Sequence, residues 1–95
     1  MLGDTLRRLR GIYGYSAREM STLLGISNSY LSEIEHGKKQ PSIDMLAKYS
    51  DVFGIRVSSL LRFSESYEGA EKRGAGQEFI TTLMSRLIDL YSEDA

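Results

Sequence analysis

One short segment, residues 28–33, carries side chains suited to recognition through hydrogen bonds. Read as part of a helix, it turns Leu31 inward, together with Ile34 just beyond it, and leaves a polar outer side. That outer side consists of Asn28, Ser29, Ser32 and Glu33, with Tyr30 beside them. Amide, hydroxyl and carboxylate groups supply hydrogen-bond donors and acceptors. We therefore predict that the outer side of this helix contacts another molecule.

The composition argues against catalytic and metal chemistry. The 95 residues contain no cysteine and a single histidine, which excludes thiolate nucleophiles and thiolate metal sites and disfavours a histidine cluster. The sequence contains no nucleophile–base pair and no glycine loop of the kind that cradles phosphate. We therefore predict no enzymatic activity, no cofactor and no metal ion, and we expect His36 to lie in a loop near a helix end.

Two short helical patterns meet at Gly25-Ile26-Ser27 and would position the polar segment. The first opens at Ser16, with Glu19 three residues later, a capping box in which each side chain satisfies a backbone donor of the other. Gly25 stands where a helix ends in a left-handed residue, a conformation that costs glycine little. Ile26 can fill the corner, and Ser27 is a good N-cap for the second helix.

Apolar spacing predicts how the two helices pack. Small Ser21 stands where they would cross most closely. The residues expected on the inward faces are Met20, Leu23 and Leu24 of the first helix and Leu31 and Ile34 of the second.

Three further helical patterns complete an all-α fold. One runs from about Asp4 to Tyr13, one is capped by Ser42 and ends at Gly54, and a short one runs from about Val57 to Arg62. The expected core residues of the second of these are Ile43, Leu46, Ala47 and Phe53. Leu60, Leu61 and Phe63 form an apolar patch that is either core or a dimer contact.

The C-terminal third separates into a linker and an amphipathic helix. Residues 64–76 are rich in glycine, serine and charge, which is typical of a linker, although part of the segment could extend a helix. From Gln77 to Ser92, at about 100° per residue, the apolar side chains fall within half a turn. They are Phe79, Ile80, Leu83, Met84, Leu87, Ile88, Leu90 and Tyr91. Such a face must be buried against its own domain, a second copy or another protein.

The charge is unevenly distributed along the chain. The net charge is −1, but residues 1–62 carry nine Lys/Arg against six Asp/Glu, whereas residues 63–95 carry three against seven. The first part is therefore positive by three and the second negative by four, which suggests separate tasks for the two parts. A modestly basic first part is compatible with binding to nucleic acid, whose affinity comes largely from phosphate neutralisation.

Residues 4–63 resemble the lambda-repressor-like, Cro-type (XRE) family of helix-turn-helix transcriptional regulators. The resemblance rests on GYSAREMSTLLGISNSYLSEIEHGKKQPS, with its serine cap, Gly25, the ending Ile34–Gly37 and Pro41-Ser42 before the next helix. The family's apolar positions are matched by Met20, Leu24, Ile26, Leu31 and Ile34. The segment SYLSEIE, followed by PSI and SSLL, is also similar to the corresponding sequence of the biofilm-type repressors of this family. Those repressors carry a helical oligomerisation tail.

The resemblance implies a five-helix DNA-binding domain over residues 1–63, a linker over 64–76, and a helix within 77–95 for dimerisation or partner binding. In this family the second helix of the motif lies in the major groove. Asn can pair with adenine, and Glu can accept from the cytosine amino group. The implied DNA-binding residues are Arg18, Ser27, Asn28, Ser29, Tyr30, Ser32, Glu33, Lys38 and Lys39.

Several assignments within this set leave alternatives open. Glu33 either reads a base or forms a local salt bridge, and Tyr30 either contacts DNA or packs sideways on its own domain. Two positions depart from the family pattern: Ala17 replaces a frequent glutamine that bridges phosphate and base, and Arg56 replaces a small capping residue. The resemblance also implies a partly buried ion pair between Arg10 and Glu35, whose disruption would cost about 3–5 kcal/mol if the site is dry.

The sequence therefore predicts a cytoplasmic, homodimeric, sequence-specific regulator of transcription, a repressor in preference to an activator. Its partners would be double-stranded DNA and a second copy of itself, with no membrane, since the chain has no run of 18 apolar residues and no signal-peptide core. The rival prediction is an antitoxin or another protein-interaction module, in which residues 77–92 bind a partner protein. Sizing of the chain with and without residues 77–95 distinguishes them.

Overall fold

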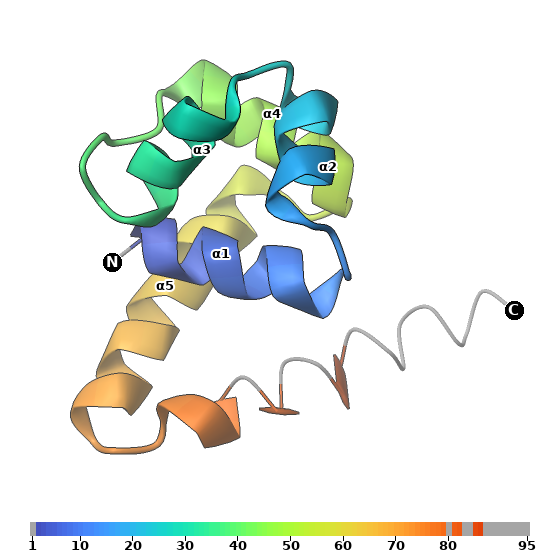
Figure 1. Cartoon of the computed structure of the whole chain (residues 1–95). Helices are drawn as coiled ribbons and strands as arrows, with labels where there is room; N and C mark the ends of the chain where they lie inside the picture. Colours follow the sequence, from blue (N-terminus) through green and yellow to red (C-terminus); the bar gives the residue numbers. More distant parts are fainter. Residues whose placement is uncertain (1, 80, 83–84, 87–95) are drawn as a thin grey trace, which may run out of the picture.

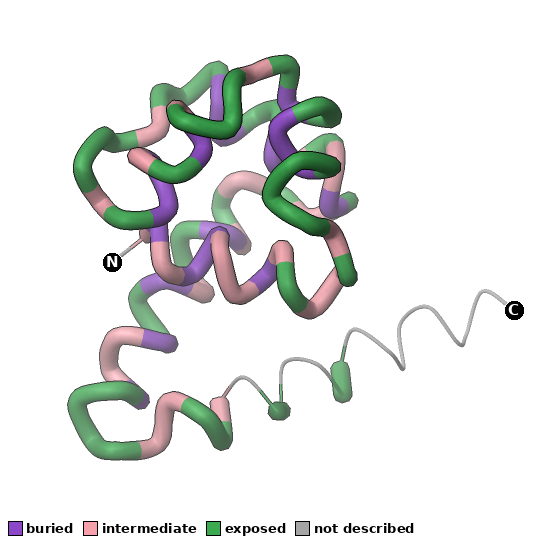
Figure 2. The backbone as a smooth tube through the Cα atoms, viewed as in Figure 1, coloured by how far each residue is buried: buried purple, intermediate pink, exposed green. Residues whose placement is uncertain are grey.

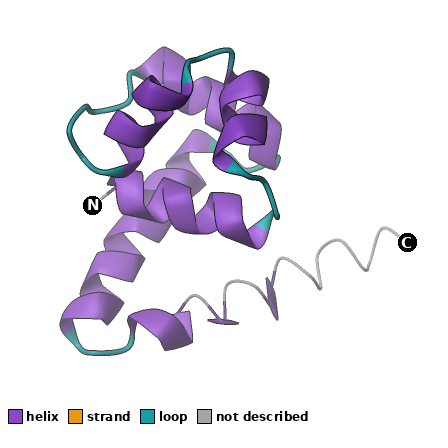
Figure 3. Ribbon diagram, in the orientation of Figure 1, coloured by secondary structure: helices purple, strands orange, loops and turns teal. Residues whose placement is uncertain are grey.

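The computed structural model describes residues 2–79, 81–82 and 85–86, and all the regular secondary structure in that part of the chain is helical (Figure 3). The helices are α1 (Leu2–Ile12), α2 (Ala17–Leu24), α3 (Asn28–Glu35), α4 (Ile43–Phe53) and α5 (Val57–Lys72). Residues 76–79 are helical as well. The predicted all-α fold is confirmed.

Helices α1 to α4 and the first half of α5 surround one hydrophobic core (Figures 1 and 2). Helix α1 packs on both α3 and α5, and α2 packs on both α3 and α4. The apolar residues at the centre of the core, each exposed by 1% or less, are Leu6, Leu9, Met20, Leu24, Leu31, Ile34, Tyr49, Phe53 and Leu60. Because each helix contributes to the same core, the core fixes the orientation of α3.

The close approach of α1 and α3 depends on one glycine. Gly3 is buried in the first turn of α1, and a Cβ at this position would overlap the backbone carbonyl of Ile34 in α3. No side chain fits between these two backbones, so glycine is required there for steric reasons. By contrast, a Cβ at Gly11, in the same helix, would meet no atom within 4 Å.

Three of the predicted inward positions are wrong. Leu23 is 52% exposed, Ile43 is 81% exposed, and Ala47 is exposed as well. In α4 the predicted core residues Leu46 and Phe53 are buried, and Met45 and Tyr49 take the places expected for Ile43 and Ala47. The reason is that α4 contains two overlapping apolar stripes, and its packing against α2 and α5 selects one of them.

Helix α5 is longer than expected. The sequence predicts an end at about Arg62, with the alternative that part of residues 64–76 extends a helix. The alternative is correct, because α5 continues to Lys72. Its buried positions, Leu60, Ser64, Tyr67 and Ala70, form one stripe at helical spacing. The second half of α5 extends beyond the other four helices (Figure 1). The ring of Phe79, which follows the next turn, lies with its centroid 6.1 Å from that of Tyr67.

The apolar patches expected to form a dimer are only partly described. Leu60 is fully buried in the core, whereas Leu61 is 45% exposed and Phe63 is half-buried. Phe79 is half-buried. The positions Ile80, Leu83, Met84, Leu87, Ile88, Leu90 and Tyr91 lie outside the described residues. Within the described part, no helix is both long enough and apolar enough to cross a bilayer.

Candidate nucleic-acid interface

The turn between α2 and α3 is built from capping interactions. The Ser16 N–H donates to Glu19 Oε1 over 2.9 Å, and the Glu19 N–H donates to Ser16 Oγ over 3.0 Å, which confirms the predicted capping box. Gly25 ends α2 in the left-handed region, with φ 72°. Ser27 Oγ then accepts from the Tyr30 N–H and caps α3. These bonds satisfy backbone groups that helix ends leave unpaired.

The crossing of α2 and α3 includes a side-chain hydrogen bond that the sequence analysis did not foresee. Ser21 is only 5% exposed, as expected for the residue at the crossing. Its hydroxyl lies 2.6 Å from Asn28 Oδ1 and 2.9 Å from the Arg18 carbonyl oxygen. The only sequence signal for this contact is a small polar residue at the crossing, seven residues before the polar residue that opens the next helix.

Helix α3 has one side in the core and the other open. Leu31 and Ile34 are fully buried, and Glu35 is 6% exposed. On the other side, the described part of the chain leaves the polar positions uncovered (Figure 2). Ser27, Asn28, Ser29 and Ser32 are exposed, and Tyr30 and Glu33 are half-buried. The residues that the structure describes therefore leave the outer side of α3 open to contact a surface.

Two of the predicted DNA-binding residues contact the loop that follows α3. Lys39 Nζ lies 3.7 Å from Glu33 Oε2 and 5.8 Å from the centre of the Tyr30 ring. The structure thus contains the local salt bridge that was one of the two readings of Glu33. Because the side chains of Lys39 and Glu33 are 58% and 38% exposed, solvent screens the pair and it contributes little to stability. It does place a carboxylate beside Lys39, which reduces the positive potential there.

The other candidate phosphate ligands are less constrained. Lys38 is exposed and forms no ion pair with the part of the chain that the structure describes. Arg18 is exposed in the first turn of α2, where the N-terminal end of the helix dipole also favours an anion. Arg18 and Lys38 flank α3 in the sequence, before and after it. Arg56, which replaces the small capping residue frequent in the family, is the N-cap of α5 and makes no side-chain capping bond.

Arg10 and Glu35 join α1 to the end of α3. Arg10 Nε donates to Glu35 Oε2 over 2.7 Å and Nη2 donates to Oε1 over 3.1 Å, while Nη1 donates to the Tyr15 carbonyl over 3.0 Å. The side chains are 18% and 5% exposed. The hydrogen bond to Glu35, the largest cause, raises the pKa of Arg10. This bidentate geometry fixes the C-terminal end of α3 relative to α1.

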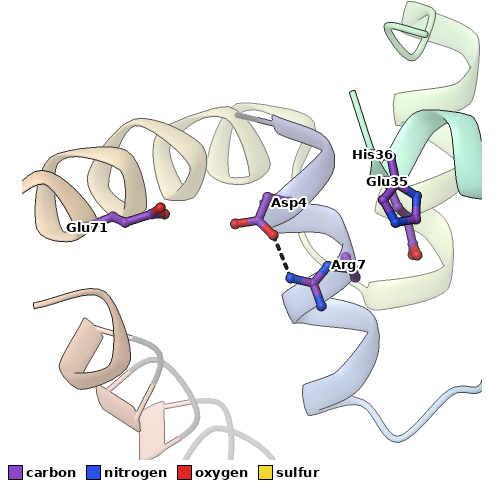
Figure 4. A pocket seen from close by; sticks show the side chains of 5 residues that line it. All are labelled: Asp4, Arg7, Glu35, His36 and Glu71. Atoms are coloured by element: carbon purple, nitrogen blue, oxygen red, sulfur yellow. Dashed lines mark hydrogen bonds and ion pairs between the residues drawn. The ribbon is translucent and has the colours of Figure 1, made fainter. Parts of the chain in front are cut away.

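A separate open pocket lies where α1, the end of α3 and α5 approach one another (Figure 4). It is lined by Asp4, Arg7, Glu35, His36 and Glu71, and Arg7 Nη2 donates to Asp4 Oδ1 over 2.8 Å. Three carboxylates outnumber the one guanidinium, so the pocket does not suit a phosphate group. His36 is the C-cap residue of α3, and its Nδ1 lies 2.8 Å from the Ser32 carbonyl oxygen. Among the described residues, no group of three acidic, histidine or cysteine side chains could hold a metal ion.

The sequence matches the family model described as helix-turn-helix over residues 6–60. It is 36% identical to the HTH-type transcriptional regulator SinR of Bacillus subtilis, over 73% of this chain and 65% of SinR. It is 34% identical to the SPbeta prophage-derived uncharacterized HTH-type transcriptional regulator YonR of the same organism, over 65% of this chain and 57% of YonR. It is 38% identical to the transcriptional regulator ClgR of Mycobacterium tuberculosis, over 64% of this chain and 54% of ClgR.

These matches confirm the predicted family and the prediction that the chain is not an enzyme, since the family and the relatives consist of transcriptional regulators. The matched region spans 54 to 65% of the length of the three relatives.

Proposed function

We propose that this chain, which belongs to the helix-turn-helix family of Cro-type regulators, is a sequence-specific DNA-binding repressor that acts as a homodimer. The observation that carries the proposal is the outer side of α3, which is polar and is not covered by any described residue, while the inner side anchors the helix in the core. A helix held in this way can enter the major groove without any rearrangement of the domain.

The proposed contacts divide into base readers and phosphate ligands. Asn28, Ser29 and Ser32 are the readers best placed by exposure. Tyr30 and Glu33 lie at the border of the same surface. Arg18, Lys38 and Lys39 neutralise phosphates on either side of α3, and Ser27 lies at the start of the helix. Lys38 carries more of this task than Lys39, because Glu33 already pairs with Lys39.

The proposed homodimer places α3 of each subunit in one half-site of a two-fold symmetric operator. The centres of the half-sites would lie about 34–36 Å apart, or a multiple of that spacing. The dimer contacts are proposed for the exposed edge of α5, which carries Leu61 and Phe63, and for the apolar side of residues 77–92. Such a regulator acts in a prokaryotic cytoplasm or nucleoid. We accordingly propose that residues 1–63 form the DNA-binding domain, that residues 64–76 connect it, and that residues 77–95 serve dimerisation or partner binding.

Selection of bound sites from random DNA tests the proposal. We expect a symmetric consensus with two half-sites at the stated spacing. Asn28→Ala should relax the preference at one base pair of each half-site, with a loss of about 1–3 kcal/mol for the preferred base. Selection that returns no consensus would overturn the sequence-specific function.

The phosphate role of Lys38 has a separate test. Lys38→Ala should weaken binding to all sequences and reduce the salt dependence of binding by about one unit of slope. Lys48→Ala is the matched control, because Lys48 is an exposed lysine of α4 outside the proposed contacts. An unchanged salt slope in the Lys38 variant, or an equal change in the Lys48 variant, would contradict the role of Lys38.

A further inference from the structure

We propose that Ser21, a buried residue that never touches DNA, determines which hydrogen-bonding edge Asn28 presents to the base it reads. Ser21 is in this sense a positioning residue for specificity. The inference rests on the proposed function, because it concerns the same surface of α3. It adds a residue of α2 to the determinants of base preference.

The contact between the two side chains is short and sheltered. Ser21 Oγ lies 2.6 Å from Asn28 Oδ1, at the short end of the range for a hydroxyl donating to an oxygen. Ser21 is 5% exposed, so water does not compete freely for the hydroxyl, whereas Asn28 is exposed and its amide can reach outward. The bond links α2 to the first residue of α3.

The hydroxyl carries one proton, which can be donated to only one acceptor at a time. The second acceptor within reach is the Arg18 carbonyl, at the longer distance of 2.9 Å. That carbonyl also accepts from the Thr22 hydroxyl over 3.0 Å, so it keeps a side-chain donor without Ser21. The proton of Ser21 therefore belongs to Asn28, and the amide oxygen of Asn28 is held toward α2.

Holding the oxygen toward α2 leaves the amide nitrogen for the ligand. Nδ2 makes no hydrogen bond within the residues that the structure describes. It would donate to a base that presents an acceptor in the major groove. Guanine presents N7 and O6, adenine presents N7 and thymine presents O4, whereas cytosine presents only its amino donor. The structure thus points to a base with an acceptor at the position that Asn28 reads, guanine above all because it has two, with cytosine as the least tolerated base.

The test compares base preferences at that single position. Site selection with the full-length Asn28→Ala variant identifies the position, and competition with the four single-base variants of the operator measures the preference. In Ser21→Ala the amide can turn and present its oxygen to the cytosine amino group. We expect the ratio of guanine to cytosine binding to fall about 3- to 10-fold, the range for one hydrogen bond, chiefly because cytosine gains.

One comparison separates this role from a structural one. In the Asn28→Ala background, Ser21→Ala should cause no further change in the profile. Affinity for random-sequence DNA should stay within about two-fold of the wild type in Ser21→Ala, which also reports that the domain is folded.

The outcomes distinguish the inference from the function on which it rests. A wild type that selects no consensus would overturn the proposed function itself. A wild type that selects an operator but prefers cytosine at the position of Asn28 would overturn the inference alone. So would a Ser21→Ala profile identical to that of the wild type, or one that changes equally at several positions.

Discussion

At the scale of single residues, the Arg10–Glu35 pair is the most constrained polar contact described. Two charge-assisted hydrogen bonds and a third to the Tyr15 carbonyl hold the guanidinium between α1, the following loop and α3. The Glu35 charge also acts on Tyr49. Burial, the largest cause, raises the pKa of the Tyr49 phenol, and the Glu35 charge raises that pKa further. The Tyr49 hydroxyl is buried without a hydrogen-bond partner among the described residues. The pair therefore stands in a poorly hydrated environment.

The first prediction concerns the loss of the charge on Glu35. Glu35→Gln should lower the free energy of unfolding by about 2–4 kcal/mol, because it leaves the Arg10 charge without its counter-ion. The value is below that for a fully dry pair, since the Arg10 side chain is 18% exposed. Urea unfolding measures the change. Glu33→Gln, which removes an exposed charge, should cost less than about 1 kcal/mol. Equal effects of the two substitutions would contradict the assignment of Glu35 to the scaffold.

At the scale of elements, the position of α3 depends on local caps and on one close helix contact. The capping box at Ser16 begins α2, the left-handed Gly25 ends it, and Ser27 begins α3. These features are encoded within a few residues of one another. The contact between α1 and α3 at Gly3 is different, because it joins segments about 30 residues apart and requires the absence of a side chain.

The second prediction tests that contact with two glycines of one helix. Gly3→Ala should destabilise the fold by about 1–3 kcal/mol, because the added methyl group must displace the backbone of α3 at Ile34. Gly11→Ala should be neutral or stabilise the fold by up to about 1 kcal/mol, since its added methyl meets nothing and alanine favours the helix. Urea unfolding curves compare them. A Gly3→Ala variant as stable as the wild type would refute the close approach.

The third prediction concerns the pH dependence of the α2 cap. The backbone N–H of Ser16, the largest cause, lowers the pKa of Glu19 from its ordinary value of 4.5. A carboxyl whose pKa is lower in the folded state stabilises the fold above the unfolded pKa and loses that contribution as the pH falls through the folded pKa. Wild type should therefore exceed Glu19→Gln in melting temperature near pH 7, and the difference should vanish near pH 3. Thermal melts at both pH values measure it, and a difference independent of pH would argue against the cap.

At the scale of the whole molecule, the distribution of charge and apolar surface separates two tasks. Residues 1–62 are positive by three and contain α3 with its flanking cations, whereas residues 63–95 are negative by four. The second half of α5 extends beyond the core helices, and its Tyr67 ring contacts both Phe79 and the Arg8 guanidinium, 5.8 Å from the ring centre. An acidic C-terminal part is poorly suited to DNA, which favours a role in assembly for it.

The fourth prediction tests that role. We expect light scattering to report a dimer for the full chain and a monomer for a variant that ends at Gly76, because the apolar side of residues 77–92 is then missing. The shortened variant should also bind a two-half-site operator more weakly, with the affinity for one half-site unchanged. A dimer in the shortened variant would move the dimer contact to Leu61 and Phe63. A full chain that is monomeric would favour the rival function, in which this segment binds another protein.

Much of the candidate site could be predicted from the sequence because its determinants are local. The capping box, the glycine turn and the N-cap of α3 each involve residues no more than about three apart, and all appear in the structure as expected. The same holds for the inward Leu31 and Ile34, whose spacing leaves the polar positions outside. The DNA contacts themselves stay a prediction.

Only the tertiary structure decided which helix faces are buried, how far α5 extends and which polar side chains pair. Periodicity allowed two apolar stripes in α4, and packing against α2 and α5 buried Met45 and Tyr49 while Ile43 stayed exposed. Composition indicated a linker over residues 64–76, part of which could also extend a helix. Tyr67 and Ala70 are buried in the structure, so α5 continues to Lys72. The Ser21–Asn28 and Glu33–Lys39 contacts arise between residues that meet only once the turns have formed. Local sequence therefore determined where helices begin and end around the turn, because caps act over single turns. The choice of buried face and polar partner required the other helices, because burial is a property of the whole packed molecule.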